Sequence, residues 1–244
     1  TARVLARNGC EVIVPHGQGC CGALNVHGGD LASGRELMKR NIAAFEALDV
    51  DAIIINAAGC GSTLKEYGHL LHDDPEWAER AAAFAAKVKD FSEYLAGLGL
   101  TGTLGAIEAR VTYQDACHLA HAQRIKQQPR QLLRAIPGLQ LIEMPEADLC
   151  CGSAGIYNIT QPAMSRRLMR RKAGNTVSVT PEIVVSGNPG CMIQLATGLR
   201  QAGAPEIKVR HLAELLDESY RRAEGQNVRR RIAADRITAP PRLP

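Results

Sequence analysis

Apolar residues follow two alternating patterns along this chain, short β-branched runs and longer segments with helical spacing. Short apolar runs bounded by polar turns are typical of strands, whereas apolar positions three and four apart indicate helices. The predicted strands are Glu11–Val14, Ala52–Asn56, Arg110–Gln114, Gln140–Glu143 and Ile183–Ser186. The predicted helices are Leu31–Leu48, Pro75–Leu98, Pro129–Ala135, Gln161–Asn175, Cys191–Gln201 and His211–Glu224. Strands that alternate with helices predict an α/β fold with parallel sheets flanked by helices.

A glycine-containing segment near residue 100 divides this pattern. The alanine-rich stretch 75–105 ends in four closely spaced glycines, which are typical of a connection between lobes. We therefore predict two tandem Rossmann-like lobes, at residues 1–100 and 101–222. Beyond Gly225 the apolar periodicity fades, and 223–244 is predicted to be a flexible basic tail.

Composition narrows the class of protein. The chain has 244 residues, of which 45% are hydrophobic and 22% charged, as in ordinary globular domains. A net charge of +4 and only 4% aromatic residues argue against a nucleic-acid-binding surface. No apolar run approaches the ~20 residues of a membrane span, and no signal peptide is recognisable. We expect a cytoplasmic protein, either free or peripheral on the inner face of the plasma membrane.

The cysteines reveal an internal repeat. Two adjacent pairs are each followed by glycine, in Cys20-Cys21-Gly22 and Cys150-Cys151-Gly152. Each pair is followed after a similar distance by a glycine-cysteine, in Gly59-Cys60 and Gly190-Cys191. The period is about 130 residues, so the chain contains two copies of one unit.

The second copy has one further cysteine, Cys117, upstream of its pair. The counterpart of Cys117 in the first copy would precede Thr1, and no initiator methionine is present. The repeat therefore predicts that the chain belongs to a longer polypeptide, with a strand and a cysteine before Thr1. The thiols of the second copy are Cys117, Cys150, Cys151 and Cys191, and those of the first are Cys20, Cys21 and Cys60.

These thiols follow predicted strands, and ligands of open parallel sheets bind beyond the carboxyl ends of strands. Sets of cysteines without histidine-rich spacing favour an iron–sulfur centre or zinc. Glycines beside the thiols allow close backbone approach and leave N–H groups for cluster sulfides. These candidates are Gly22, Gly59, Gly152 and Gly190. His118 adjoins Cys117 and is a further candidate cofactor-binding residue, or a base beside Cys117 with Asp115.

The repeated unit resembles the cysteine-rich CCG domain. That domain is shared by a subunit of heterodisulfide reductase, succinate:quinone reductase variants, lactate-utilisation proteins and the iron–sulfur subunits of glycolate oxidase. The segments 148–158 and 187–194 are most similar to the C-terminal half of the glycolate oxidase subunits. The resemblance implies metal ligation by the seven repeated cysteines, a [4Fe-4S] cluster, and no catalytic residue in this subunit. It also implies electron transfer from an FAD-containing partner that oxidises glycolate or D-lactate, toward a membrane quinone or another acceptor.

One departure from the family pattern keeps alternatives open. Heterodisulfide reductase-type domains often end in Cys-x-x-Cys, but Thr63 and Gln194 lie three residues after Cys60 and Cys191. A thiol–disulfide redox module therefore ranks below electron transfer, beside a zinc-binding structural subunit.

Other motifs have simpler interpretations. The run from Gly17 to Gly22 fits G-x-G-x-x-G, but the second copy keeps only its Cys-Cys-Gly, which argues against nucleotide binding. Cys10 has no counterpart and is predicted to be a packed apolar residue. His16 and His121 are predicted at the surface, and the basic run 166–172 is predicted to be a solvated helix face.

Overall fold

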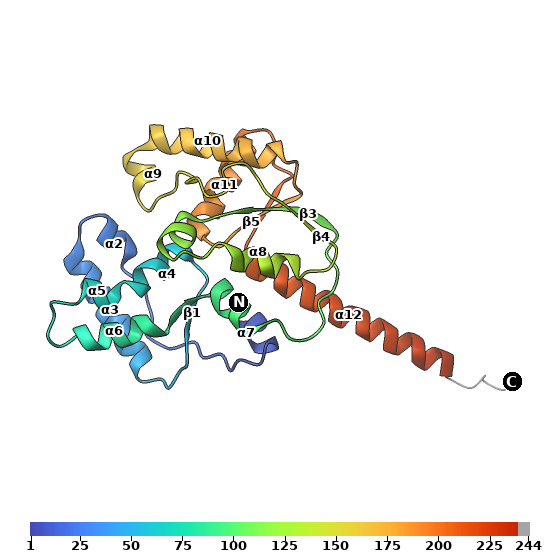
Figure 1. Ribbon diagram of the computed structural model, residues 1–244, viewed down its shortest axis with the longest axis horizontal. Helices are drawn as coiled ribbons and strands as arrows, with labels where there is room; N and C mark the ends of the chain where they lie inside the picture. Colours follow the sequence, from blue (N-terminus) through green and yellow to red (C-terminus); the bar gives the residue numbers. More distant parts are fainter. Residues whose placement is uncertain (239–244) are drawn as a thin grey trace.

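The computed structural model describes residues 1–238, with side chains described through residue 225. It has the predicted α/β architecture, with two parallel sheets flanked by helices (Figure 1). The second lobe contains the larger sheet, in the order β4-β3-β5-β6, and all its strands run parallel. Its strands are β3 (Ala109–Gln114), β4 (Leu139–Ile142), β5 (Ile183–Ser186) and β6 (Lys208–Arg210). β3 lies in the interior, where Val111 is in register with Leu141 on one side and Ile183 on the other.

Helices cover both faces of this sheet because its central strands are apolar on both faces. Ile183 and Val185 of β5 pack into one buried cluster, and Val184 packs into another on the opposite face. The first cluster includes residues of α8 and α12, and the second includes residues of α11. The helices of this lobe are the π-helix η1 (His118–Ala122), α8 (Gln127–Arg134), α9 (Tyr157–Thr160), α10 (Pro162–Ser178), α11 (Pro189–Gln201) and α12 (Leu212–Thr238).

The first lobe has a two-stranded parallel sheet of β1 (Ile53–Ile55) and β2 (Val88–Asp90). Its helices are α1 (Ala2–Arg7), α2 (Ala23–His27), α3 (Leu31–Glu46), α4 (Ala58–Lys65), α5 (Tyr67–Leu70), α6 (Ala78–Lys87) and α7 (Phe91–Leu98). Met38, Ile42, Tyr67 and Phe84 form its core against β1. The element order repeats that of the second lobe, so β1 corresponds to β5, and α1 to α8.

The two lobes share one hydrophobic core. α1 packs on α12, and α7 packs on α8, so each lobe lends helices to the other. Leu5, Leu95, Leu133 and Leu216 are buried together in this cluster with the apolar residues of β3 and β5. The loops after β1 and β5 also meet, where the Ala58 N–H donates to the Gly187 carbonyl at 3.1 Å. The boundary at residue 100 was predicted from the repeat and remains a prediction. The helices on either side of it pack together in one core.

Two predicted elements are wrong. The helix Pro75–Leu98 is interrupted by β2, because Asp90 ends that strand and caps α7 through a capping box with Glu93. The strand Glu11–Val14 is an extended segment without sheet partners, and the side chain of Val14 is 68% exposed. An apolar run becomes a strand only where a neighbour accepts its backbone hydrogen bonds. β2 and β6 have only three residues each, which is too short for a periodicity to show.

The C-terminal segment also differs from its prediction. α12 continues through Thr238, so the backbone of 223–238 is helical where a flexible tail was expected, and residues 239–244 lie outside the described residues. Its alanines, arginines and glutamate have high helix propensity, which explains a helix without strong apolar periodicity. Among the helices that the structure describes, none combines the length and the apolar character needed to span a membrane.

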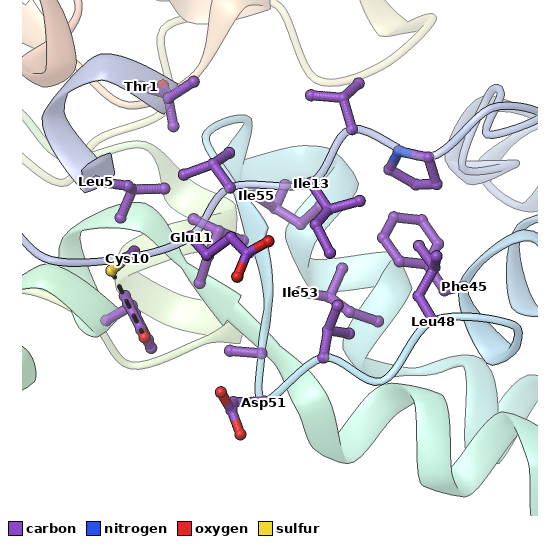
Figure 2. A pocket seen from close by; sticks show the side chains of 18 of the residues that line it. Thr1, Leu5, Cys10, Glu11, Ile13, Phe45, Leu48, Asp51, Ile53 and Ile55 are labelled. Carbon is purple, nitrogen blue, oxygen red and sulfur yellow. Dashed lines mark hydrogen bonds between the residues drawn. The ribbon is translucent and has the colours of Figure 1, made fainter.

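A groove of about 540 Å³ separates the extended segment 10–15 from β1. Figure 2 shows Ile13, Ile53 and Ile55 among the side chains that line this groove, together with Thr1 and with Leu5 of α1. Cys10 lines the groove, and its thiol donates to the Tyr94 hydroxyl at 3.9 Å. Cys10 therefore packs among apolar residues, as predicted, apart from the repeated cysteines.

Candidate metal centre

The four repeated cysteines of the second lobe come together beyond the carboxyl ends of its strands. Cys117 follows β3 and precedes η1, and π-helical turns are frequent at functional sites. Cys150 and Cys151 lie on the loop after β4, and Cys191 lies in the first turn of α11 after β5. The side chain of Cys150 interacts with those of Cys117 and Cys151, and Cys151 interacts with Cys191. These contacts link the four thiols in the order Cys117, Cys150, Cys151 and Cys191, and this linked set is called the row below.

These contacts divide the row into two kinds of thiol. The Cys117 and Cys151 side chains lower the pKa of the Cys150 thiol, and Cys151 lowers the pKa of Cys191. The same contacts, followed by burial, raise the pKa of Cys117 and Cys151. Cys151 and Cys191 are almost fully buried, at 2% and 4% exposure. Buried thiolates need hydrogen-bond donors or a cation, so the row is suited to a positively charged cofactor.

Two N–H groups donate to Cys150 and Cys191, the two thiols whose pKa is lowered. The backbone N–H of Gly152 lies 3.3 Å from the Cys150 sulfur, and the Asn188 amide nitrogen lies 3.3 Å from the Cys191 sulfur. Asn188 also accepts from the Gly59 N–H of the first lobe at 3.1 Å. Such bonds stabilise negative charge on cysteine sulfur. Asn188 was missed from the sequence, although its place in the Gly-Asn-Pro-Gly-Cys turn before Cys191 marks it.

The glycine after each cysteine pair allows the following helix to approach. Gly152 has φ +92°, and a Cβ there would lie 2.4 Å from the Ser165 carbonyl oxygen on α10. Gly22 has φ +79°, and a Cβ there would lie 2.9 Å from the Gly34 carbonyl oxygen on α3. Both glycines therefore fix the pair against its helix, a role that the repeat alone did not reveal. At the second glycine-cysteine, a Cβ on Gly190 would lie 2.9 Å from the Ser153 hydroxyl.

In the first lobe, two of the three repeated cysteines, Cys21 and Cys60, are in contact. Cys21 is buried and interacts with Cys60, which raises the pKa of Cys21 and lowers that of Cys60 to about 7. Cys20 is exposed, and its electrostatic effect on Cys60 places it nearby. Tyr67 donates to the Cys21 carbonyl at 2.8 Å, and the Asn41 amide donates to the Cys20 carbonyl at 2.9 Å. This lobe thus repeats the arrangement with three thiols.

His118 lies at the edge of the four-thiol row. Its Nδ1 is 3.6 Å from the Cys117 sulfur, and burial lowers the pKa of its imidazole. The alternative base arrangement with Asp115 is not formed, because both carboxylate oxygens of Asp115 accept from Arg130, at 2.8 and 2.7 Å. The rings of His118 and His27 are 5.5 Å apart, so the two lobes meet beside the thiols.

The basic run 166–172 is only partly a solvated face. Arg166, Arg167 and Arg170 are exposed, as predicted, but Lys172 is wholly buried. The Lys172 ammonium donates to the carbonyls of Glu146 and Ala147, on the loop that leads to Cys150. The positions of the absent fifth thiolates are occupied by Thr63, which is buried, and Gln194, which donates to Ser165 at 3.1 Å.

The donor set of the second lobe is that of an iron–sulfur cluster. In residues 1–225, no three His, Cys, Asp or Glu side chains meet in a way that could bind one metal ion. The second lobe instead supplies four thiols from three strand ends, and two of their sulfurs accept from N–H groups. Cysteine thiolates with hydrogen bonds to sulfur are the ligand set of an iron–sulfur cluster. The donor chemistry is all sulfur, which soft iron–sulfur centres require.

Comparison with known proteins gives a consistent family. The model of the CCG family, described as a cysteine-rich domain, matches residues 1–65 and 111–196. The chain is 48% identical over 222 residues to the probable glycolate oxidase iron-sulfur subunit of Bacillus subtilis, covering 90% of this chain and 50% of that protein. It therefore spans half the length of this relative.

Two further relatives differ in size. The chain is 31% identical over 218 residues to lactate utilization protein A of Geobacillus kaustophilus, covering 89% of this chain and 90% of that protein. It is 36% identical over 218 residues to a subunit of the fumarate reductase (CoM/CoB) of Methanothermobacter marburgensis, covering 89% of this chain and 42% of that protein.

Proposed function

The chain belongs to the CCG cysteine-rich domain family, and we propose that it is the iron–sulfur, electron-transferring part of a flavin-dependent 2-hydroxy-acid oxidase or dehydrogenase. The observation that carries this proposal is the row of four thiols in the second lobe, with N–H donors at two of its sulfurs. The names of two relatives, a probable glycolate oxidase subunit and a lactate utilization protein, support the substrate class.

In this proposal, the ligands in the second lobe are Cys117, Cys150, Cys151 and Cys191. Four thiolates suffice for a [4Fe-4S] cluster, which supplies one-electron transfer when bound. Gly152 and Asn188 would donate to the ligand sulfurs and so stabilise added negative charge. Cys20, Cys21 and Cys60 of the first lobe form an equivalent set, which lacks a fourth thiolate from the described residues.

The substrate would react on a partner that contains FAD. Oxidation of a 2-hydroxy acid to a 2-oxo acid releases two electrons and two protons, which reduce the flavin. The electrons would then pass singly through this subunit to an acceptor such as a membrane quinone. We place such a complex in the cytoplasm, peripheral to the inner face of the membrane. The close approach of the two lobes at His27 and His118 favours transfer between the two sets of thiols.

Counting iron and acid-labile sulfide after anaerobic reconstitution tests this proposal. We expect iron and sulfide in equal amounts, visible absorption from thiolate-to-iron charge transfer, and a reducible paramagnetic signal. Cys150→Ser should remove the cluster of the second lobe, whereas Cys10→Ser is the matched control at an unrelated thiol. Colourless protein with stoichiometric zinc would instead establish the structural alternative. Reduction of a disulfide substrate by the loaded protein would establish the thiol–disulfide alternative.

A further inference from the structure

A buried charge distinguishes the two copies of the repeat. Gly34 on α3 contacts Gly22, and Ser165 on α10 contacts Gly152. Seven positions along each helix, from 34 to 41 and from 165 to 172, lie Asn41 and Lys172. Seven residues make two helical turns, so each residue faces the loop that carries its cysteine pair.

Both side chains hydrogen-bond that loop, but only one is charged. Asn41 accepts from the Gly19 N–H at 2.9 Å and donates to the Cys20 carbonyl. Lys172 donates to the Glu146 carbonyl and, at 3.0 Å, to the Ala147 carbonyl. Lys172 is 0% exposed and interacts electrostatically with Cys150, Cys151 and Cys191. Burial lowers the pKa of the Lys172 ammonium, whereas the charges of Cys151 and Asp115 act to raise it. The two carbonyl acceptors hold it beside the loop of the cysteine pair, as a positive charge close to the thiols of the second lobe.

We infer that Lys172 is a positioning residue that makes the centre of the second lobe easier to reduce. This inference rests on the proposed iron–sulfur function. Reduction by one electron adds one negative charge to a cluster, and a buried cation nearby stabilises that charge. Asn41 positions the loop of the first lobe without supplying a charge.

The midpoint potential of the reconstituted protein tests the role of Lys172. Lys172→Met should lower the midpoint of the second-lobe cluster, measured by titration of its paramagnetic signal. Arg170→Met removes the same charge from the exposed face of α10 and should leave the midpoint unchanged. Lys172→Gln keeps a donor for the two carbonyls and should also lower the midpoint.

The outcomes separate this inference from the function that it assumes. A midpoint unchanged in Lys172→Gln, with full iron content, would show that Lys172 only positions the loop, and would overturn the inference alone. Absence of iron and sulfide from the wild-type protein would refute the proposed function itself. Should Lys172→Met not fold, Lys172→Gln still decides between the two.

Discussion

Replacement of Gly152 by alanine tests whether the loop of the second cysteine pair is held by the close approach of α10. Gly152 has φ +92°, which costs an alanine roughly 1–2 kcal/mol. Its new Cβ would lie 2.4 Å from the Ser165 carbonyl oxygen, an overlap that costs a further ~1–3 kcal/mol. Gly152→Ala should therefore reduce the free energy of unfolding by about 2–5 kcal/mol and displace Cys150 and Cys151.

Urea unfolding, followed by circular dichroism, measures the first effect, and iron content after reconstitution measures the second. Gly174→Ala is the matched control, because Gly174 lies on α10, the helix that Gly152 contacts, and a Cβ there would have no atom within 4 Å. That control should stabilise the protein by ~0.5–1 kcal/mol through helix propensity. A Gly152→Ala protein whose free energy of unfolding stays within about 0.5 kcal/mol of wild type would refute the close-approach argument.

Three further predictions concern other parts of the molecule. Asp217 accepts from Arg3, and this contact lowers the pKa of the Asp217 carboxyl from 3.8 to about 2. The stabilisation from the ionised carboxylate should therefore be present above pH 4 and be lost as the pH falls toward 2. The contribution is about 2 kcal/mol, and Asp217→Asn should remove it from a series of unfolding measurements between pH 7 and pH 2. Asn188→Ala removes the acceptor of the Gly59 N–H and should lower the free energy of unfolding by ~1–3 kcal/mol, measured by thermal unfolding. An unchanged free energy would show that water replaces the amide and would contradict this prediction. Cys60→Ser should leave the iron of the second lobe intact, and loss of both clusters would show that the lobes assemble them together.

The repeat predicted the cysteines of the site, but not the residues that support them. The sequence alone grouped Cys117, Cys150, Cys151 and Cys191, because each follows a predicted strand. The carboxyl ends of parallel strands share one edge of the sheet, so this grouping did not require the order of the strands in the sheet. It could not identify Lys172, since a lysine in a basic helical run looks like its exposed neighbours until the helix is packed. Asn188 likewise depends on a contact with Gly59 of the other lobe, which is distant in sequence.

The fold was predicted least well where neighbours decide local structure. Buried strands such as β5 were recognised from their apolar runs, and helices such as α10 from their periodicity. β2 was hidden inside an alanine-rich helical pattern, because three residues between two helices carry almost no signal of their own. The segment 11–14 has the composition of a strand, but only an adjacent strand could make it one.

The core that α1 and α7 share with α8 and α12 has a consequence for motion. Separating the lobes would expose Leu5, Leu95, Leu133 and Leu216 to water, and burying each such side chain is worth roughly 1.5–3 kcal/mol. A hinge between the lobes is therefore prohibitively costly, and they should melt in a single cooperative transition. Under the proposed function, the gap that an electron would cross between the two sets of thiols is thus a constant of the structure, and the rate of crossing should be independent of any domain opening.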